Sequence, residues 1–217
     1  MTDERANDRA ATEPGVHGSA PTPPPTDPDP VPPGIARIRD FVNTREIDGS
    51  AVTEWWATPG DLGASLVAQG LAEEGARVSA DDLALALRVR EAVRELLEAN
   101  AGHRMGPGSM AVLDEAAAGT PLAVRFDAAG AATLGPGTSG VPGALGRVFA
   151  DIAIAVADGT WPRLKACRND ECRWAYYDAS RNRSARWCSM AGCGNRMKGR
   201  AYRDRARSSF GMVGWTD

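Results

Sequence analysis

Four cysteines constrain this chain more than any other feature, because they fall in two pairs of equal spacing. Four residues separate Cys167 from Cys172 and Cys188 from Cys193, and fifteen residues lie between the two pairs. Two close cysteine pairs joined by a short insert are typical of a four-thiolate metal site, and zinc binds four thiolates in a tetrahedron. We therefore predict one structural zinc ion per chain, held by all four cysteines, with no open position for catalysis.

Three other interpretations of the cysteines are weaker. Two disulfides would need an oxidising compartment, whereas residues 1–5 lack the basic start and apolar stretch of a secretory signal, so we expect a cytoplasmic protein. An iron–sulfur cluster also takes four thiolates, but the usual ferredoxin spacings differ from this one. Unconnected buried cysteines would not be expected to form two pairs of equal spacing.

The net charge of −3 conceals a strong asymmetry along the chain. Residues 1–160 contain 12 Lys and Arg against 23 Asp and Glu, a net of −11, whereas residues 161–207 contain 13 against 4, a net of +9. All four cysteines lie inside the basic block. Such an asymmetry indicates a polyanionic partner, and duplex DNA is the partner we expect.

A helix is expected from just after Cys193 to about residue 208, and it would carry a ridge of arginines. At 100° per residue, Arg196, Arg200, Arg203 and Arg207 fall within a sector of about 60°, without matching acids. This ridge and the polar, basic segment over 180–187 suit the phosphates and groove of a duplex. Bracing the zinc turn is a competing role for Asn195 and Arg196. The predicted DNA contacts are Arg181, Asn182, Arg183, Arg186, Asn195, Arg196, Lys198, Arg200, Arg203 and Arg207.

Residues 180–196 closely resemble the signature of the CGNR zinc-finger family, which is named for the tetrapeptide Cys193-Gly194-Asn195-Arg196. The resemblance is dense over residues 164–205 and looser in the N-terminal part, where it covers residues 40–45 and 87–94. It implies a two-part bacterial protein, with an N-terminal domain called ABATE and a C-terminal zinc module. It also implies a transcription regulator that responds to stress or to a ligand.

The rest of the chain predicts an α+β protein with a mainly helical N-terminal domain. Residues 1–33 hold nine of the fifteen prolines and predict a disordered tail. Residues 34–160 form the ABATE-like domain, residues 161–210 the zinc finger with a short strand and a basic helix, and residues 211–217 a second tail. The clearest helix begins after Ser79, with Asp82 as a capping partner, and runs to about residue 99. Further helices are expected near 61–70, 109–118 and 143–158, a β-hairpin over 122–134, and a strand or short helix over 35–44.

Other chemistry in the sequence is sparse. His17 and His103 have no neighbouring nucleophile or carboxylate arrangement, so we expect no enzyme. No run of eighteen apolar residues exists, so we expect no membrane span. Asn43, Arg45 and Arg88 are the polar residues we would test for a small-molecule effector, although core hydrogen bonding or surface exposure is the favoured role for them.

The sequence therefore predicts a zinc-dependent DNA-binding transcription regulator, whose N-terminal domain senses a small ligand or a stress signal. The alternative is a zinc-stabilised RNA- or protein-binding adaptor, because phosphate neutralisation does not distinguish DNA from RNA. Trp174, Tyr176, Tyr177 and Trp187 would then stack on unpaired bases. A homodimer that reads a two-part site is compatible with either hypothesis.

Overall fold

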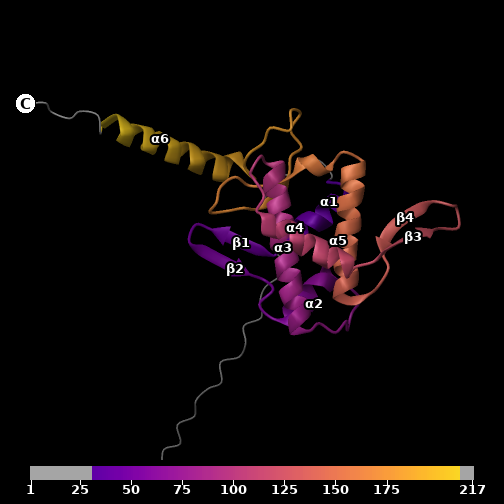
Figure 1. The fold of residues 1–217 in the computed structure, drawn as a ribbon. Helices are drawn as coiled ribbons and strands as arrows, with labels where there is room; N and C mark the ends of the chain where they lie inside the picture. Colours follow the sequence, from indigo (N-terminus) through magenta and orange to yellow (C-terminus); the bar gives the residue numbers. More distant parts are fainter. Residues whose placement is uncertain (1–30, 211–217) are drawn as a thin grey trace, which may run out of the picture.

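The computed structural model describes residues 31–210 and has the α+β character that the sequence predicts. In Figure 1 the helices gather into one body, except for the last helix, which extends away from it, and a β-hairpin stands out on another side. Each strand pairs with one neighbour in an antiparallel, two-stranded sheet. The body helices are α1 (Pro33–Val42), α2 (Pro59–Ala68), α3 (Ala80–Asn100), α4 (Pro107–Ala118) and α5 (Gly140–Ala157). The strand pairs are β1 (Arg45–Asp48) with β2 (Ala51–Glu54), β3 (Leu122–Phe126) with β4 (Ala132–Pro136), and β5 (Leu164–Ala166) with β6 (Ala175–Tyr177).

The long helix α3 lies at the centre of the body and begins where its capping residues predict. Ser79 accepts a hydrogen bond from the Asp82 amide at 3.1 Å, and Asp82 accepts one from the Ser79 amide at 2.9 Å. This capping box satisfies two amides that would otherwise lack helical partners. Val89, Val93 and Leu97 are fully buried on the helix. Helix α3 thus anchors the hydrophobic core that α1, α2, α4 and α5 complete.

Helix α5 is, among the described helices, the one long and apolar enough to cross a membrane by length and composition. Half of it is buried inside the protein. Its buried Asp151 accepts two hydrogen bonds of 2.8 Å from Arg37 of α1. A half-buried helix with an internal ion pair is typical of a protein core, and the packing against α1 accounts for the apolar composition.

The strands β5 and β6 join the basic C-terminal block to the helical core. Leu164, Ala166 and Ala175 are buried in the same hydrophobic cluster as α1 and α3. Asn43, just after α1, spans Ala175 with two hydrogen bonds, since its Oδ1 accepts from the Ala175 amide at 2.8 Å and its Nδ2 donates to the Ala175 carbonyl at 2.9 Å. Asn100, at the end of α3, donates to the carbonyl of Leu164 at 2.9 Å. The C-terminal block therefore packs on the body through buried hydrogen bonds as well as apolar contacts.

Some elements differ from their predicted form. The segment over 35–44, left open between strand and helix, is helical to Val42. A hairpin follows it over 45–54, which the sequence analysis did not identify, and its turn contains Gly49 with φ +64°. Helix α5 begins at Gly140, three residues earlier than predicted. The predicted tails at 1–30 and 211–217 lie outside the described residues.

Candidate metal centre and basic surface

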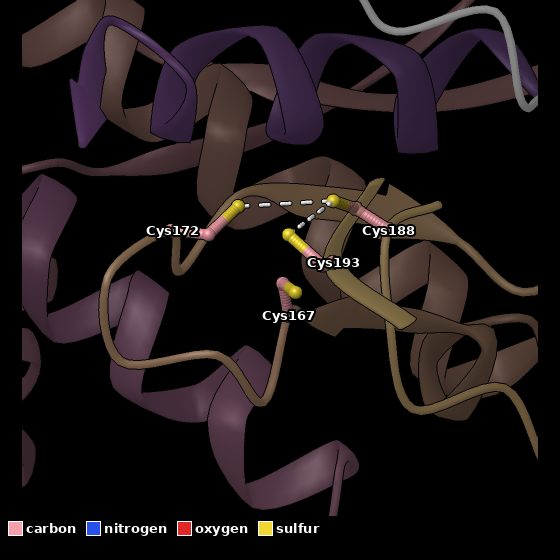
Figure 2. Close-up of side chains that lie close together, drawn as sticks. All are labelled: Cys167, Cys172, Cys188 and Cys193. Carbon is pink, nitrogen blue, oxygen red and sulfur yellow. Dashed lines mark hydrogen bonds between the residues drawn. The ribbon is translucent and has the colours of Figure 1, made fainter. Parts of the chain in front are cut away.

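The four cysteine side chains converge on one point (Figure 2). All four Sγ atoms lie within 4.8 Å of one another, and two of the separations, Cys172–Cys188 and Cys188–Cys193, are 3.7 and 3.8 Å. A tetrahedron with zinc–sulfur distances of about 2.3 Å places its sulfurs about 3.8 Å apart. A disulfide needs sulfurs about 2.05 Å apart, and all four cysteines are free. The cluster therefore fits a tetrathiolate metal ion, and the four cysteines form no disulfide in this structure.

Each cysteine pair lies on a tight turn, which hydrogen bonds between residues of the same turn stabilise. In the first turn, the Asn169 carbonyl accepts hydrogen bonds from the amides of Cys172 and Arg173 at 2.8 and 3.0 Å. In the second turn, Ser189 accepts from the Gly192 amide through Oγ at 3.2 Å and from the Gly194 amide through its carbonyl at 2.9 Å. These turns bring the two sulfurs of each pair to the same side, which four residues of spacing permit.

Asn169 is a supporting residue that the sequence analysis missed. Its side chain is buried, its Nδ2 lies 3.6 Å from Cys193 Sγ, and its Oδ1 accepts the Glu171 amide at 3.3 Å. A donor to a ligating sulfur fixes the orientation of the ligand and offsets the negative charge of the thiolates. Only its position four residues before Arg173, inside the first cysteine turn, could have indicated this role.

The sulfurs perturb one another's protonation. Hydrogen bonds from the Cys172 and Cys188 thiols lower the pKa of Cys167, whereas the hydrogen bonds shared with Cys167 raise the pKa of Cys172 and of Cys188. These three sulfurs therefore do not ionise independently of one another. A divalent cation must displace the remaining thiol protons as it binds, so binding weakens as the pH falls.

A buried ion pair fixes the segment that follows β6. Lys165 of β5 contacts Asp178 at 2.7 Å, and both side chains are almost fully buried. Burial alone would raise the pKa of Asp178, but hydrogen bonds from Lys165 and Ser180 outweigh it, and the pKa is lowered. Asp178 also accepts the Ala185 amide at 3.0 Å, and Lys165 donates to the Arg183 carbonyl at 2.6 Å. The two side chains thus hold the backbone of the basic segment over 180–187.

All ten predicted DNA contacts are exposed, and most lie on helix α6 (Asn195–Phe210), which extends away from the body in Figure 1. Two of the arginines have acidic partners from other elements, which the sequence did not indicate. Arg196 contacts Asp48 of β1 at 3.0 Å, and Arg200 contacts Glu171 at 3.6 Å. Both pairs are at least half exposed, so solvent screens them, and each arginine can still reach another anion.

The aromatic residues predicted to stack on unpaired bases are less accessible than the basic ones. Trp174 and Tyr176 are buried, and Tyr176 donates its hydroxyl to the Ala185 carbonyl at 2.8 Å. Tyr177 and Trp187 are partly buried. The exposed aromatic residue in this region is Tyr202 on α6.

The three residues predicted for an effector do not meet in one site. Asn43 is buried, and its amide is bonded to Ala175. Arg45 is partly exposed and lies 3.6 Å from Glu91 on α3. Arg88 is exposed and lies 3.5 Å from Glu115 on α4. The effector role of these residues remains a prediction, and the structure gives each of them a contact of its own.

The buried Arg94 and the partly exposed Arg173 fasten the metal-binding segment to α3. Arg94 donates to the carbonyls of Val42 and Arg173 at 2.6 and 2.9 Å, and Arg173 contacts Glu98 at 2.6 Å. Burial lowers the pKa of Arg94 to about 10, which still leaves the guanidinium charged at neutral pH. Arg173 itself has φ +52°, a left-handed conformation that these two contacts hold in place.

A cavity of about 380 Å³ lies between the β1–β2 hairpin and the metal centre. Its lining combines residues more than 100 positions apart in the sequence, so the sequence carried no signal for it. The hairpin side contributes Glu46, Ile47, Asp48 and Trp55, and the metal-binding side contributes Cys172, Trp174, Cys188, Ser189, Gly192, Cys193 and Arg196.

Comparison with known families accounts for both parts of the chain. Residues 36–159 match the model of the ABATE family, described as "Putative stress-induced transcription regulator". Residues 163–206 match the model of the CGNR zinc finger, which confirms the resemblance seen in the sequence. No curated protein matches the chain. The two matched regions meet where β5 and β6 pack against α1 and α3.

Proposed function

Because the chain belongs to the ABATE family and carries a CGNR zinc finger, we propose that it is a zinc-dependent transcription regulator that binds duplex DNA through helix α6. The observation that carries this proposal is the shape of the basic surface. Helix α6 carries six Lys and Arg against one Asp, and it extends from the metal centre into solvent. The proposal contains no catalytic step.

The dimensions of α6 suit a major groove. Its 16 residues give a length of about 24 Å, and a groove about 12 Å wide accepts one helix. Four arginines lie within about 60° of the helix circumference, while Lys198 and Arg205 lie roughly opposite them. A helix inside a groove has a phosphate backbone on each side. Cations on two faces of α6 therefore suit a position inside the groove better than a position along a single backbone.

The zinc ion would be held by Cys167, Cys172, Cys188 and Cys193, and it would supply rigidity rather than chemistry. Helix α6 begins two residues after Cys193. An isolated helix of this length is marginal in water, so a fixed first turn matters for the position of the rest. On this proposal, metal removal releases the first turn and weakens DNA binding.

The observations favour duplex DNA over single-stranded RNA. Binding to unpaired bases needs exposed aromatic platforms, and Trp174 and Tyr176 are buried. The exposed Tyr202 leaves single-strand binding as the alternative that the experiment must address. A preference for single strands in direct competition would replace the proposal with the adaptor hypothesis.

The first experiment selects from a pool of random duplexes with the full-length, zinc-loaded chain and with a metal-stripped control. Enrichment of a sequence only with zinc supports the proposal, and absence of retention in both samples refutes it.

The second experiment compares the salt dependence of binding for R200E/R203E and for R77E/R104E, a matched pair of exposed charge reversals outside the basic block. Loss of two phosphate contacts should reduce the salt slope by about 1.8, or 0.9 for each contact. An unchanged slope for R200E/R203E would remove both residues from the interface.

A further inference from the structure

The cavity beside the metal centre has a negative lining. Glu46 and Asp48 contribute carboxylates, and three of the four cysteines face it. A zinc ion held by four thiolates carries a net charge of −2, so acids and thiolates together outweigh Arg196, the one cation in the lining. The hydrogen bond with Asp48 raises the pKa of Arg196, so this cation is already paired with one of the two carboxylates. The cavity is therefore a place where a second positive charge is favoured.

The same cavity has an apolar and aromatic side. Ile47, Trp55 and Trp174 line it together with the charged groups. Its volume of about 380 Å³ lies within the range of small-molecule sites, and one zinc ion bound within about 2.3 Å of the sulfurs would fill only one end of it. Indole rings beside carboxylates are the surroundings that bind organic cations, because the ring faces attract positive charge.

We propose that this cavity binds a small organic cation with an apolar or aromatic body. The ammonium or guanidinium group would lie between the carboxylates of Glu46 and Asp48 and the ring of Trp55, and the apolar body would lie against Ile47 and Trp174. Among residues 31–210, the carboxylate of Glu46 forms no hydrogen bond or ion pair, so it is available to a ligand. This site shares no residue with the effector candidates that the sequence indicated.

The position of the cavity connects it to helix α6. Arg196 lies in the first turn of α6 and contacts Asp48 across the cavity rim at 3.0 Å. A cation bound beside Asp48 competes with Arg196 for that carboxylate and so changes how the hairpin holds α6. This regulatory consequence rests on the proposed function, whereas binding of the cation does not.

Calorimetric titration of the full-length, zinc-loaded chain at low ionic strength tests the site, with tryptophan fluorescence as a second readout. The probe is benzyltrimethylammonium, and the comparison compounds are benzyl alcohol, which is uncharged, and phenylacetate, which is an anion. The cation should bind at least about tenfold more tightly than either compound, given the usual strength of a desolvated cation–aromatic contact. Equal binding of the three compounds, or no binding of the cation, would overturn the proposal.

Two variants locate the binding. E46Q removes an exposed charge that makes no other contact among the described residues, and it should weaken cation binding about tenfold; W55L should weaken it by a similar factor. E115Q, an exposed substitution on α4, is the matched control and should bind as the wild type does. Zinc content and circular dichroism verify that each variant is folded. Cation affinity in folded E46Q equal to that of E115Q would refute this assignment.

The titration is carried out without DNA, so the two proposals fail separately. Failure of cation binding overturns the site while duplex binding stands. Loss of duplex binding with the cation site intact refutes the proposed function alone.

Discussion

The buried ion pair between Lys165 and Asp178 provides the sharpest test of how the basic segment is held. In D178N the Oδ1 acceptor can still receive the Ser180 amide, but the new amide group faces two donors, the Lys165 ammonium and the Ala185 amide. The side-chain exposures of Lys165 and Asp178 are 7% and 0%, so water cannot replace the lost acceptor. Removing one partner of a buried pair costs about 3–5 kcal/mol.

This cost is measured by urea unfolding of the zinc-loaded chain. With an m-value of about 2 kcal/mol/M, the unfolding midpoint of D178N should fall by about 1.5–2.5 M. The control is E115Q, which breaks the exposed contact with Arg88, 3.5 Å long, and should change stability by less than about 1 kcal/mol. A midpoint for D178N within the range of E115Q would refute the reasoning that this pair is a buried structural element.

The pH dependence of the same variant has a defined sign. The pKa of Asp178 is lowered in the folded protein, so its contribution to the free energy of unfolding is complete above the unfolded value of about 3.9. It is lost as the pH falls from there through the folded pKa. D178N should therefore lose less stability than the wild type as the pH falls below about 4. An identical acid dependence for both proteins would show that Asp178 is not ionised in the folded state.

Two further predictions concern the metal centre and its attachment. C188S should reduce bound zinc well below one ion per chain and reduce the helicity of the C-terminal block, because a hydroxyl is a poor zinc ligand; unchanged metal content by mass spectrometry would exclude Cys188 from the site. N43A should lower the free energy of unfolding by about 2–4 kcal/mol, because the amide and carbonyl of Ala175 both lose a buried partner. Retained zinc with this loss of stability would identify Asn43 as structural, whereas unchanged stability would contradict the hydrogen bonds seen here.

Local patterns made the metal site and the main helices predictable. The spacing of Cys167, Cys172, Cys188 and Cys193 depends on residues that lie close in sequence, and so does the capping of α3 by Ser79 and Asp82. Both are short-range rules, and the structure follows them. The hairpin over 45–54 was missed because its strands are only four residues each and mostly exposed, so they carry no clear alternation of apolar and polar residues.

Contacts between distant segments were not predictable in the same way. Asp48 and Arg196 are 148 residues apart, and Asn43 and Ala175 are 132 apart. The sequence singled out Asn43 and favoured core hydrogen bonding or surface exposure over a ligand role, but a polar residue next to an apolar helix gives no indication of which backbone it will meet. The cavity could not be predicted for the same reason, because it forms between two segments that are distant in sequence, the hairpin and the metal-binding turns.

The strengths of these long-range contacts decide which of them a signal could alter. Coupling between a ligand site and a second site usually amounts to about 1–3 kcal/mol. Separating Arg94 from the carbonyls of Val42 and Arg173 would leave two buried donors of its guanidinium unpaired, with only the contact to Glu91 remaining, at a cost of about 1–3 kcal/mol for each donor. The pair of Arg196 and Asp48 is exposed to solvent on both sides, and solvent screening makes it far weaker than the buried contacts. A ligand of ordinary coupling strength therefore cannot detach the metal-binding segment from α3, but it can displace Arg196 from the hairpin and so act on the first turn of α6.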